Sequence, residues 1–555
     1  MLVSEAVGRA VVALGADRVF GVVGSGNFHV TNAMVAAGAE YVAARHEAGA
    51  TTMADAYARV SGRLGVVTVH QGPGLTNATT GITEAAKSRT PLLVLAAETG
   101  AAAVRSNFRI DQAGLAAALG AVPERVHSAG SARADVVRAV RRAVVERRTV
   151  VLNLPLDVQA QEFPGDLDGL TPVRPLPAPR PAADAAAALG RLIAGAERPV
   201  FLAGRGARAA GPELAALAGR SGALLATSAV AKGLFAGDPW ALDVSGGFAT
   251  PLAAELIAGA DLVVAWGCSL SMWTTRHGRL VGPHATVAQV DLDPDVFGAN
   301  QPADLAVLGD VAATAAALDV PAATGYRTPE VKDRIGAEGR WRSVSYVDSG
   351  TGGDSGTGGD GRTGGGTIDP RTLSIALDDA LPADRVVAVD SGNFMGYPSM
   401  YLDVPDAHGF VFTQGFQSVG LGLASAIGAA LARPDRLPVA ALGDGGALMG
   451  IAELETAVRL HLPLVVVVYD DRGYGAEVHH FGPDGFDLAT VRFPDADIAA
   501  IARGFGCAGV TVRRRADLAP LTDWLRGPRE TPILLDAKVS ADRGAWWLEE
   551  AFRGH

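Results

Sequence analysis

The chain alternates short apolar runs, rich in valine and leucine, with longer alanine-rich stretches. Short runs of branched apolar residues without polar interruption are typical of strands buried on both faces. Strands that alternate with helical stretches predict βαβ units, and therefore an α/β fold in which parallel sheets are covered by helices. The runs expected to form strands are Val66–Val69, Leu92–Ala96, Val150–Leu152, Val200–Leu202, Leu262–Ala265, Val386–Val389, Val439–Leu442 and Leu464–Val468.

Two compositional breaks divide the chain. Residues 164–182 are proline-rich and are expected to form an extended linker. Residues 349–366 are almost wholly Gly, Ser, Thr and Asp, so they cannot bury enough apolar surface to become ordered, and we expect a disordered connector there. A chain of 555 residues is also too long for one ordinary core. The predicted organisation is three α/β domains at residues 1–163, 183–325 and 368–540, with linkers at 164–182 and 326–367 and a C-terminal tail at 541–555.

Charge and cysteine content exclude several classes of protein. The net charge of −11 argues against a surface that binds a polyanion, so nucleic acid is not expected as a partner. Two cysteines, Cys268 and Cys507, allow neither a disulfide framework nor a cysteine-rich metal site. The N-terminus carries Glu5 and no basic head before an apolar run, unlike a secretory signal, and no apolar stretch reaches membrane-spanning length. We therefore expect a cytoplasmic protein with no membrane partner.

The strand expected at 437–442 leads into a glycine-rich turn, Gly443-Asp444-Gly445-Gly446. Such a turn between a strand and a helix lets the backbone approach a phosphate, and the free N–H groups of the helix favour an anion. Asp444 fits this arrangement if a divalent cation bridges its carboxylate and the phosphate. The alternative is a tight turn in which Asp444 caps the helix. Residues 447–460 are expected to form that helix, with one apolar face made of Leu448, Ile451, Leu454 and Val458.

The strand Leu464–Val468 runs through Tyr469 into two adjacent carboxylates, Asp470 and Asp471. Because like charges repel, we expect either compensation of at least one carboxylate or exposure of both to water. Consecutive strands of a parallel sheet end at the same edge, so Asp471 is expected near Asp444. Mg²⁺ prefers octahedral oxygen coordination, which these carboxylates, a backbone carbonyl, diphosphate oxygens and water would complete. The two strand ends together predict a site for Mg²⁺ and a diphosphate.

The segments GDGG at 443–446 and YDDRGYGAE at 469–477 resemble the bipartite GDG…NN motif of thiamine-diphosphate-dependent enzymes. The resemblance covers essentially the whole chain apart from the glycine-rich insert and the tail. It is strongest to the acetolactate synthase and 2-oxo acid decarboxylase branch, which includes benzoylformate decarboxylase. The resemblance implies three Rossmann-like or flavodoxin-like domains in the order pyrimidine-binding, central and diphosphate-binding, which matches the three segments above.

By position, the resemblance implies that Asp444, Asp471 and the carbonyl of Gly473 hold Mg²⁺ on the cofactor's diphosphate. It also implies cofactor contacts from the glycines of the turn, which are Gly443, Gly445 and Gly446. Asp471 departs from the family, which usually has Asn at this position. An aspartate keeps the ligand oxygen but adds a charge beside the diphosphate. We therefore hypothesise that cofactor affinity depends more strongly on Mg²⁺ and on pH than in an asparagine-containing relative.

Glu47 opens an alanine-rich stretch in the setting Arg45-x-Glu47-x-x-Ala50. For an isolated glutamate, a favourable interaction with the helix dipole is a sufficient explanation. In the family that this chain resembles, the glutamate in this setting binds N1′ of the aminopyrimidine and shares a proton with it. The resemblance further implies that the Gln417 carbonyl accepts from the cofactor's amino group and that Val419 supports the bent cofactor. By spacing alone, Val419 would be a core residue.

Three further residues are expected to face the substrate. Ser25 and His70 follow strand-like runs, and loops at strand ends form the sites of open α/β sheets. They match the substrate-contacting serine and histidine of benzoylformate decarboxylase; the alternative for His70 is a hydrogen-bonded loop histidine. Glu477 matches an active-site glutamate of pyruvate decarboxylases, but the paired histidines of those enzymes are absent from residues 100–120. The sequence assigns no role to Asp470, His479 or His480.

The central segment resembles the central domain of acetolactate synthases. The segments that carry this resemblance are 203–211, 265–282 and 287–294. In some relatives this domain binds FAD without a redox role, and in others it binds nothing. The glycine pattern alone does not establish a flavin site, so FAD is kept as an alternative to a central domain without a cofactor.

The resemblance implies a thiamine-diphosphate- and Mg²⁺-dependent enzyme that acts on a 2-oxo acid. Overall similarity favours decarboxylation followed by carboligation of the enamine to a second carbonyl compound, as in acetolactate synthase. Ser25, His70 and Glu477 favour the alternative, a simple decarboxylase that releases an aldehyde. A flavin-dependent redox enzyme and an inactive binding homologue are the remaining alternatives. The family builds each site across two subunits, so a homodimer or homotetramer is implied, while the 2-oxo acid and the acceptor do not follow from the sequence.

Overall fold

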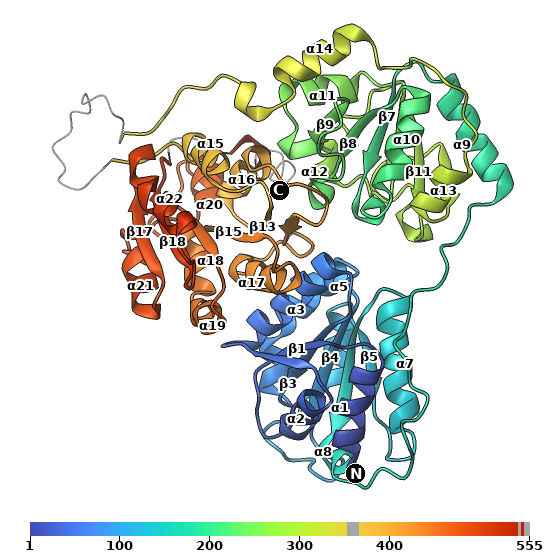
Figure 1. Ribbon diagram of the computed structural model, residues 1–555, viewed down its shortest axis with the longest axis vertical. Coiled ribbons are helices and arrows are strands. Elements are labelled where there is room, and N and C mark those ends of the chain that lie inside the picture. Colours follow the sequence, from blue (N-terminus) through green and yellow to red (C-terminus); the bar gives the residue numbers. More distant parts are fainter. Residues whose placement is uncertain (352–365, 542–544, 549–555) are drawn as a thin grey trace.

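The computed structural model describes residues 1–351, 366–541 and 545–548. The connector expected at 349–366 therefore lies largely outside the described residues, as does most of the tail expected at 541–555. Three parallel six-stranded sheets, each with helices against it, follow one another along the chain (Figure 1). The prediction of an α/β fold with parallel sheets covered by helices is confirmed. None of the helices in the described residues is long and apolar enough to cross a bilayer.

The first sheet has the strand order β2-β1-β3-β4-β6-β5. Its strands are β1 (Arg18–Gly21), β2 (Glu40–Ala43), β3 (Gly65–Val69), β4 (Leu92–Glu98), β5 (Val122–Arg125) and β6 (Thr149–Pro155). The helices of this first body are α1 (Val3–Ala13), α2 (Phe28–Ala36), α3 (Glu47–Ser61), α4 (Pro73–Asn77), α5 (Thr79–Lys87), α6 (Gln112–Ala118), α7 (Ala132–Val145) and α8 (Leu156–Gln159).

The third sheet has the order β14-β13-β15-β16-β18-β17, which repeats the order of the first sheet strand for strand. Its strands are β13 (Arg385–Val389), β14 (Phe410–Phe412), β15 (Leu437–Gly443), β16 (Val465–Asp470), β17 (Ala508–Val512) and β18 (Ile533–Lys538). The helices of this third body are α15 (Pro370–Ala380), α16 (Gly396–Tyr401), α17 (Gly422–Ala432), α18 (Asp444–Met449), α19 (Glu453–Arg459), α20 (Gly475–Phe481), α21 (Ile498–Phe505) and α22 (Ala519–Arg526). The first and third bodies therefore share one topology.

The central sheet has the order β12-β11-β10-β7-β8-β9, the strand order of doubly wound dinucleotide-binding folds. Its strands are β7 (Pro199–Ala203), β8 (Leu224–Thr227), β9 (Ala241–Val244), β10 (Leu262–Trp266), β11 (Thr286–Asp291) and β12 (Leu305–Leu308). The helices of this body are α9 (Ala183–Gly195), α10 (Gly211–Ser221), α11 (Pro251–Ala258), α12 (Met272–Thr275), α13 (Val311–Ala317) and α14 (Pro329–Glu338).

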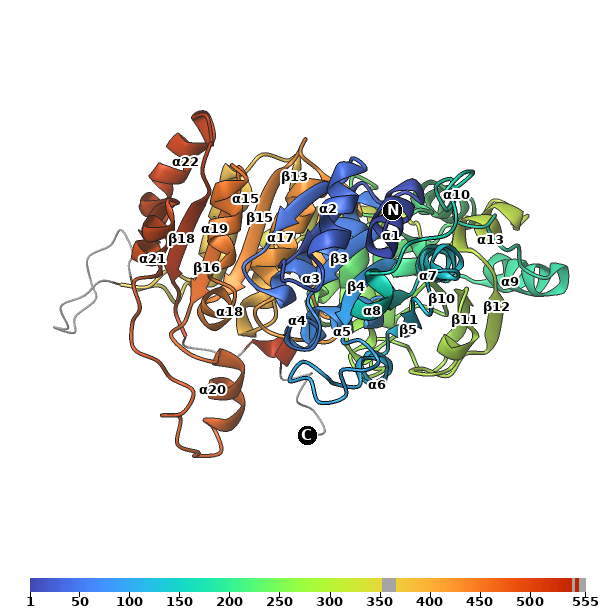
Figure 2. The same cartoon turned by 90° about the horizontal axis from the view of Figure 1, so that it is seen from below.

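The first and third bodies share a hydrophobic core through α3 and α17, which lie side by side (Figure 2). A Cβ atom on Gly428 would lie 2.1 Å from the carbonyl oxygen of Met53, so glycine permits the close approach of the two helices. The side chains of Met53 and Ile427 are fully buried in the same apolar cluster. Burial of this apolar surface stabilises a fixed relation between the two bodies.

The prediction of a single helix at 447–460 is wrong. The structure has two short helices, α18 and α19, which are separated around Gly450. Glycine has a low helix propensity, and α18 starts earlier than expected, at Asp444. Leu448 is 41% exposed whereas Leu454 is fully buried, so the expected apolar face is not continuous.

Candidate active site

Two neighbouring strand ends bring Asp444 and Asp471 to one cavity. β15 and β16 are paired in parallel, with Gly443 opposite Tyr469. Asp444 is the first residue of α18, directly after β15, and Asp471 directly follows β16. Both residues line a cavity of about 470 Å³ together with Gly473. The three residues expected as metal ligands therefore lie together at one edge of the third sheet.

The electrostatics of this pair favour a bound cation. Burial, followed by the nearby charge of Asp470, raises the pKa of Asp444 from 3.8 to about 7. Burial, followed by the charges of Asp444 and Asp470, likewise raises the pKa of Asp471 to about 7. Among the described residues, no group of three or more His, Cys, Asp and Glu side chains is arranged to hold a metal ion. An ion at this position would therefore need backbone and external oxygen ligands as well.

Asp470 is neutralised on the other side of β16. Its carboxylate pairs with the ammonium group of Lys538 on the neighbouring strand β18, and both side chains are buried. Lys538 also lies 2.7 Å from Asp495 and 3.1 Å from Asp536. One carboxylate of the adjacent pair is thus compensated, as expected. The sequence analysis assigns no role to Asp470, and the structure shows that it forms a buried ion pair.

Glycines around the two carboxylates allow neighbouring side chains to approach the backbone closely. A Cβ atom on Gly475 would lie 2.2 Å from Asp471 Oδ2, and one on Gly446 would lie 2.5 Å from Asp390 Oδ2. A Cβ atom on Gly445 would lie 2.8 Å from the ring of Tyr474. Any larger residue at these positions would displace the groups that line the cavity. Gly443 lines the same cavity.

Gln417 and Val419 line the same cavity from the segment that precedes α17. Gln417 has a left-handed backbone, with φ of 63°, which is uncommon for a residue other than glycine. Val419 is 37% exposed, so it does not belong to the buried core that its spacing suggested. Strained residues that persist at a cavity are held there by their surroundings and often mark functional sites.

Glu477 also lines this cavity, at the start of α20. Two polar side chains that the sequence did not single out join it there, Asn393 and Gln414. Within the described residues, Asn393 Oδ1 and Gln414 Nε2 are buried without a hydrogen-bond partner. Buried polar atoms without partners cost free energy, and a polar ligand in the cavity would satisfy them.

The remaining predicted residues lie in the first body. Glu47 begins α3, is 9% exposed and accepts a hydrogen bond from Asn77 Nδ2 at 3.0 Å. His70 Nδ1 accepts from the N–H of Gly26 at 3.1 Å, and burial lowers the pKa of His70, which keeps the ring neutral and able to accept. Ser25 is exposed. None of Glu47, Ser25 and His70 is among the residues that line the 470 Å³ cavity of the same chain.

Comparison with known proteins matches all three bodies to one family. Residues 1–116 match the thiamine pyrophosphate enzyme N-terminal TPP binding domain, residues 186–318 its central domain and residues 390–537 its C-terminal TPP binding domain. The chain is 32% identical to a probable 2-ketoarginine decarboxylase of Pseudomonas aeruginosa over 94% of this chain and 91% of the relative. The chain belongs to the thiamine pyrophosphate enzyme family.

Relatives in the thiamine pyrophosphate enzyme family carry different activities in their names. The chain is 30% identical to a sulfoacetaldehyde acetyltransferase of Castellaniella defragrans over 94% of this chain and 90% of the relative. It is 26% identical to the acetolactate synthase isozyme 2 large subunit of Escherichia coli over 97% of this chain and 96% of the relative. The family therefore processes 2-oxo acids and aldehydes, and the predicted resemblance is confirmed at that level.

The central body of this thiamine pyrophosphate enzyme holds a second, larger cavity. Its volume is about 1020 Å³, and it lies at the carboxyl ends of the central strands, where Gly204, Gly267 and Asp291 line it. Trp273 and Gln417 line both this cavity and the 470 Å³ cavity. The position suits a nucleotide in such a fold, so the FAD alternative stays a prediction.

Several residues that line the 470 Å³ cavity of this thiamine pyrophosphate enzyme were not expected from the sequence. Trp273 reaches it from the central body, and Leu548 reaches it from the segment after the third sheet. Trp547, next to Leu548, is buried against Gly396, where a Cβ atom would lie 2.5 Å from the indole. No motif marks Leu548, and Trp273 lies in the segment 265–282 without being singled out there, because the contacts of both follow from packing between distant segments.

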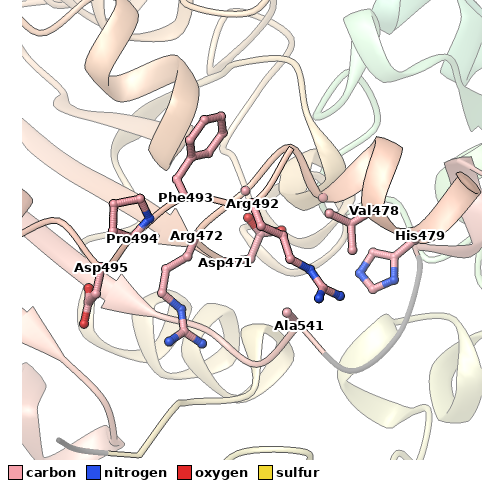
Figure 3. A pocket seen from close by; sticks show the side chains of 11 residues that line it. Asp471, Arg472, Val478, His479, Arg492, Phe493, Pro494, Asp495 and Ala541 are labelled. Atoms are coloured by element: carbon pink, nitrogen blue, oxygen red, sulfur yellow. The ribbon is translucent and has the colours of Figure 1, made fainter. Parts of the chain in front are cut away.

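A third cavity, of about 480 Å³, shares Asp471, Gly473 and Gly475 with the 470 Å³ cavity (Figure 3). Arg472, Arg492 and His479 contribute basic side chains to its lining. In Figure 3 the side chains of Arg492 and His479 lie near one end and that of Arg472 near the other. His479, to which the sequence analysis assigns no role, lines this cavity together with Asp471 and is not among the residues that line the 470 Å³ cavity.

Proposed function

We propose that the protein is a Mg²⁺- and thiamine-diphosphate-dependent enzyme that decarboxylates a 2-oxo acid and joins the product to a second carbonyl compound. The observation that carries this proposal is the convergence of Asp444, Asp471, Gly473, Gln417 and Val419 on one cavity of about 470 Å³. Thiamine diphosphate is the cofactor that the family models name as thiamine pyrophosphate.

The residues present fit this cofactor. Asp444, Asp471 and the carbonyl of Gly473 would hold Mg²⁺, whose charge would offset two carboxylates that repel each other. Gly445 and Gly446 line the cavity, and their backbone would approach the diphosphate without a side chain in the way. Asn393 and Gln414 would supply polar contacts that the protein alone leaves unmade.

Thiamine diphosphate, when bound, supplies the electron sink that allows a 2-oxo acid to lose CO₂. Glu47 would hold and move a proton at the pyrimidine nitrogen, a role that needs a carboxyl group shielded from water. Val419 and the Gln417 carbonyl would orient the cofactor from the opposite side. Glu477 would hold a proton at the reacting carbon, since it lines the same cavity.

Two copies of the chain are part of this proposal. Glu47, Ser25 and His70 do not line the cavity that holds Asp444 in the same chain. We therefore infer that a homodimer or homotetramer brings these residues of one copy to the cavity of another. A closed two-fold arrangement would complete two sites at once.

A simple decarboxylase that releases an aldehyde is the second candidate. The position of Glu477 in the cavity favours it, because an acid near the reacting carbon can protonate it before a second substrate arrives. The relative named as a probable 2-ketoarginine decarboxylase is consistent with this candidate.

Product analysis separates the two candidates. The enzyme is incubated with Mg²⁺, thiamine diphosphate and a panel of 2-oxo acids, with and without added aldehydes, and both CO₂ and organic products are measured. Carboligation predicts a carbon–carbon bonded product for each CO₂ released. Free aldehyde as the sole product would support the decarboxylase, and a visible flavin absorption band in the purified protein would support FAD in the central cavity.

A further inference from the structure

Glu84 and Glu453 lie on equivalent helices of the two bodies that share a topology. Glu84 lies on α5, the second helix after β3, and Glu453 begins α19, the second helix after β15. β3 and β15 hold the same place in their sheets. Both glutamates are buried, with 1% and 2% of their area exposed.

Glu84 reaches from the first body to the main chain of the third. Its Oε1 accepts from the N–H of Gly415 at 3.0 Å, and its Oε2 accepts from the N–H of Phe416 at 2.6 Å. Arg59 donates to the same carboxylate at 2.8 Å. Burial raises the pKa of Glu84, but Arg59 and the two main-chain donors outweigh burial and hold that pKa below its usual value. The next residue along the chain is Gln417, whose backbone is left-handed.

Glu453 makes the reciprocal contact from the third body to the first. Its Oε1 accepts from the N–H groups of Arg45 and His46, each at 3.1 Å. The next residue along the chain is Glu47. A Cβ atom on Gly49 would lie 2.3 Å from Glu453 Oε1, so glycine leaves space for the carboxylate.

Cohesion between the bodies does not explain these contacts. The apolar packing of α3 on α17 already holds the two bodies together. A buried carboxylate costs desolvation free energy that an apolar contact would not. What a carboxylate adds is direction, because two acceptor oxygens fix the orientation of two successive peptide N–H groups. In both cases the fixed peptides directly precede a residue expected at the cofactor.

We propose that Glu84 and Glu453 are positioning residues for the cofactor site, each acting from the opposite body of the same chain. Glu84 sets the backbone that presents Gln417 and Val419, and Glu453 sets the backbone that presents Glu47. The inference rests on the proposed function, because it assigns these segments to thiamine diphosphate.

Glu84→Gln tests the first half. Glutamine keeps the size of the side chain, but its amide nitrogen cannot accept, so one of the two N–H groups loses its partner. We expect faster hydrogen exchange in the peptide that contains Gly415 and Phe416, measured by mass spectrometry on the cofactor-free full chain. We also expect binding of thiamine diphosphate in the presence of Mg²⁺ to weaken about tenfold by calorimetry, the loss of a charge-assisted contact.

Asp55→Asn is the matched control. Asp55 is equally buried and accepts from the same Arg59 at 3.0 Å and from Thr90 at 2.6 Å, but it touches neither amide. We expect the control to leave exchange at Gly415 and cofactor affinity unchanged. Equal behaviour of Glu84→Gln and the control would overturn the proposal. If Glu84→Gln fails to fold, Glu84→Asp is measured in the same way; failure of both to fold while the control folds would show a structural role and also overturn it.

Glu453→Met tests the second half by a split between kcat and affinity, because methionine offers no carboxylate oxygen to the N–H groups of Arg45 and His46. Because Glu47 handles a proton while the metal ligands carry the diphosphate, we expect kcat to fall about tenfold with little change in the dissociation constant of thiamine diphosphate. The control is Glu455→Met on the same helix, whose side chain pairs with the Arg45 guanidinium instead of its N–H. An unchanged kcat in Glu453→Met, or failure of that variant alone to fold, would contradict the role.

These outcomes are distinct from failure of the proposed function. If the wild-type chain binds no thiamine diphosphate, the proposed function fails. The exchange comparison at Gly415 and Phe416 needs no cofactor, so it would still show whether Glu84 holds that segment. If the wild type binds and turns over while the variants match their controls, only the positioning roles fail.

Discussion

The ammonium group of Lys538 pairs with the buried carboxylate of Asp470, across the neighbouring strands β18 and β16. This ion pair distinguishes the environments of the two adjacent aspartates at the end of β16. Asp470 is neutralised within the protein. Asp471, by contrast, has no ion-pair partner in the described part of the chain and lines the 470 Å³ cavity. The charge of Asp471 is therefore left for a bound cation.

Removal of the buried ammonium group of Lys538 should destabilise the fold. In Lys538→Met, the carboxylates of Asp470 and Asp536 would remain buried without their partner. We expect a loss of about 3–5 kcal/mol in the free energy of unfolding, measured by urea denaturation. Arg334→Met, which breaks an exposed pair with Glu255, is the control and should leave the midpoint unchanged. A midpoint for Lys538→Met equal to that control would refute the account of Asp470.

Asp471→Asn should reduce the dependence of cofactor binding on Mg²⁺ and pH. The amide keeps a ligand oxygen but removes one of two charges that repel each other beside the diphosphate. The effect is measured by titration of Mg²⁺ at a fixed concentration of thiamine diphosphate. The titration is repeated at about pH 6 and about pH 8, which lie below and above the raised pKa values. We expect the wild type to bind markedly better at the higher pH and the variant to show a smaller dependence, since only Asp444 of the pair still titrates in it. Identical metal dependence in both proteins would count against the role of Asp471.

The metal-free protein should lose stability as the pH rises from about 4 to about 7. The pKa values of Asp444 and Asp471 are raised from 3.8 to about 7 in the folded chain, so the folded state holds protons that the unfolded state has released in this range. Stability therefore falls as the pH rises through the window, and bound Mg²⁺ should oppose the fall. Thermal melting with EDTA and with Mg²⁺ across this range is the measurement. A metal-free melting temperature that rises steadily from pH 4 to pH 7 would show that other groups dominate.

Two defective chains should complement each other. In a mixed dimer of Glu47→Gln and Asp444→Ala chains, one site would carry both defects and the other neither. We expect each variant alone to be inactive and the doubly tagged, purified mixed dimer to recover about half of the wild-type activity, as closed two-fold symmetry predicts. Mixed dimers without activity would show that each site is built within one chain.

Glu477 should control the partition between products. Glu477→Gln removes an acid from the cavity while nearly preserving shape. We expect a larger ratio of carboligation product to aldehyde, with a fall of about 100–10,000-fold in aldehyde release, the range of a lost general acid. The ratio is measured by chromatography of products from one 2-oxo acid and one acceptor. An unchanged ratio would remove Glu477 from the proton-transfer step.

The proximity of Asp444 and Asp471 could be predicted because it depends on a local rule. Parallel strands end at one edge of a sheet, so a carboxylate after each of two consecutive strands suffices to place Asp444 near Asp471. The α/β class followed for the same reason, from alternation along the chain. The prediction of one helix at 447–460 was wrong because the apolar periodicity took no account of Gly450 or of the early start at Asp444.

Contacts between distant segments could not be predicted in the same way. The pairing of Asp470 with Lys538 requires β16 and β18 to be neighbours, which strand patterns alone do not specify. Trp273 reaches the cavity from the central body and Leu548 from the segment after the third sheet. Trp273 lies in the segment 265–282 and Leu548 in no motif, and nothing local to either residue indicates the cavity. Glu84 follows no motif either, because its partners are main-chain N–H groups of another body.

Calorimetric titration of thiamine diphosphate into the protein tests directly whether the cavity at the carboxyl ends of β15 and β16 is a Mg²⁺–thiamine diphosphate site. The account predicts saturable binding of one cofactor per chain with Mg²⁺, loss of binding in EDTA, and loss of binding in Asp444→Ala with Mg²⁺ present. Binding by Asp444→Ala as tight as that of the wild type, or no binding by the wild type, would contradict it.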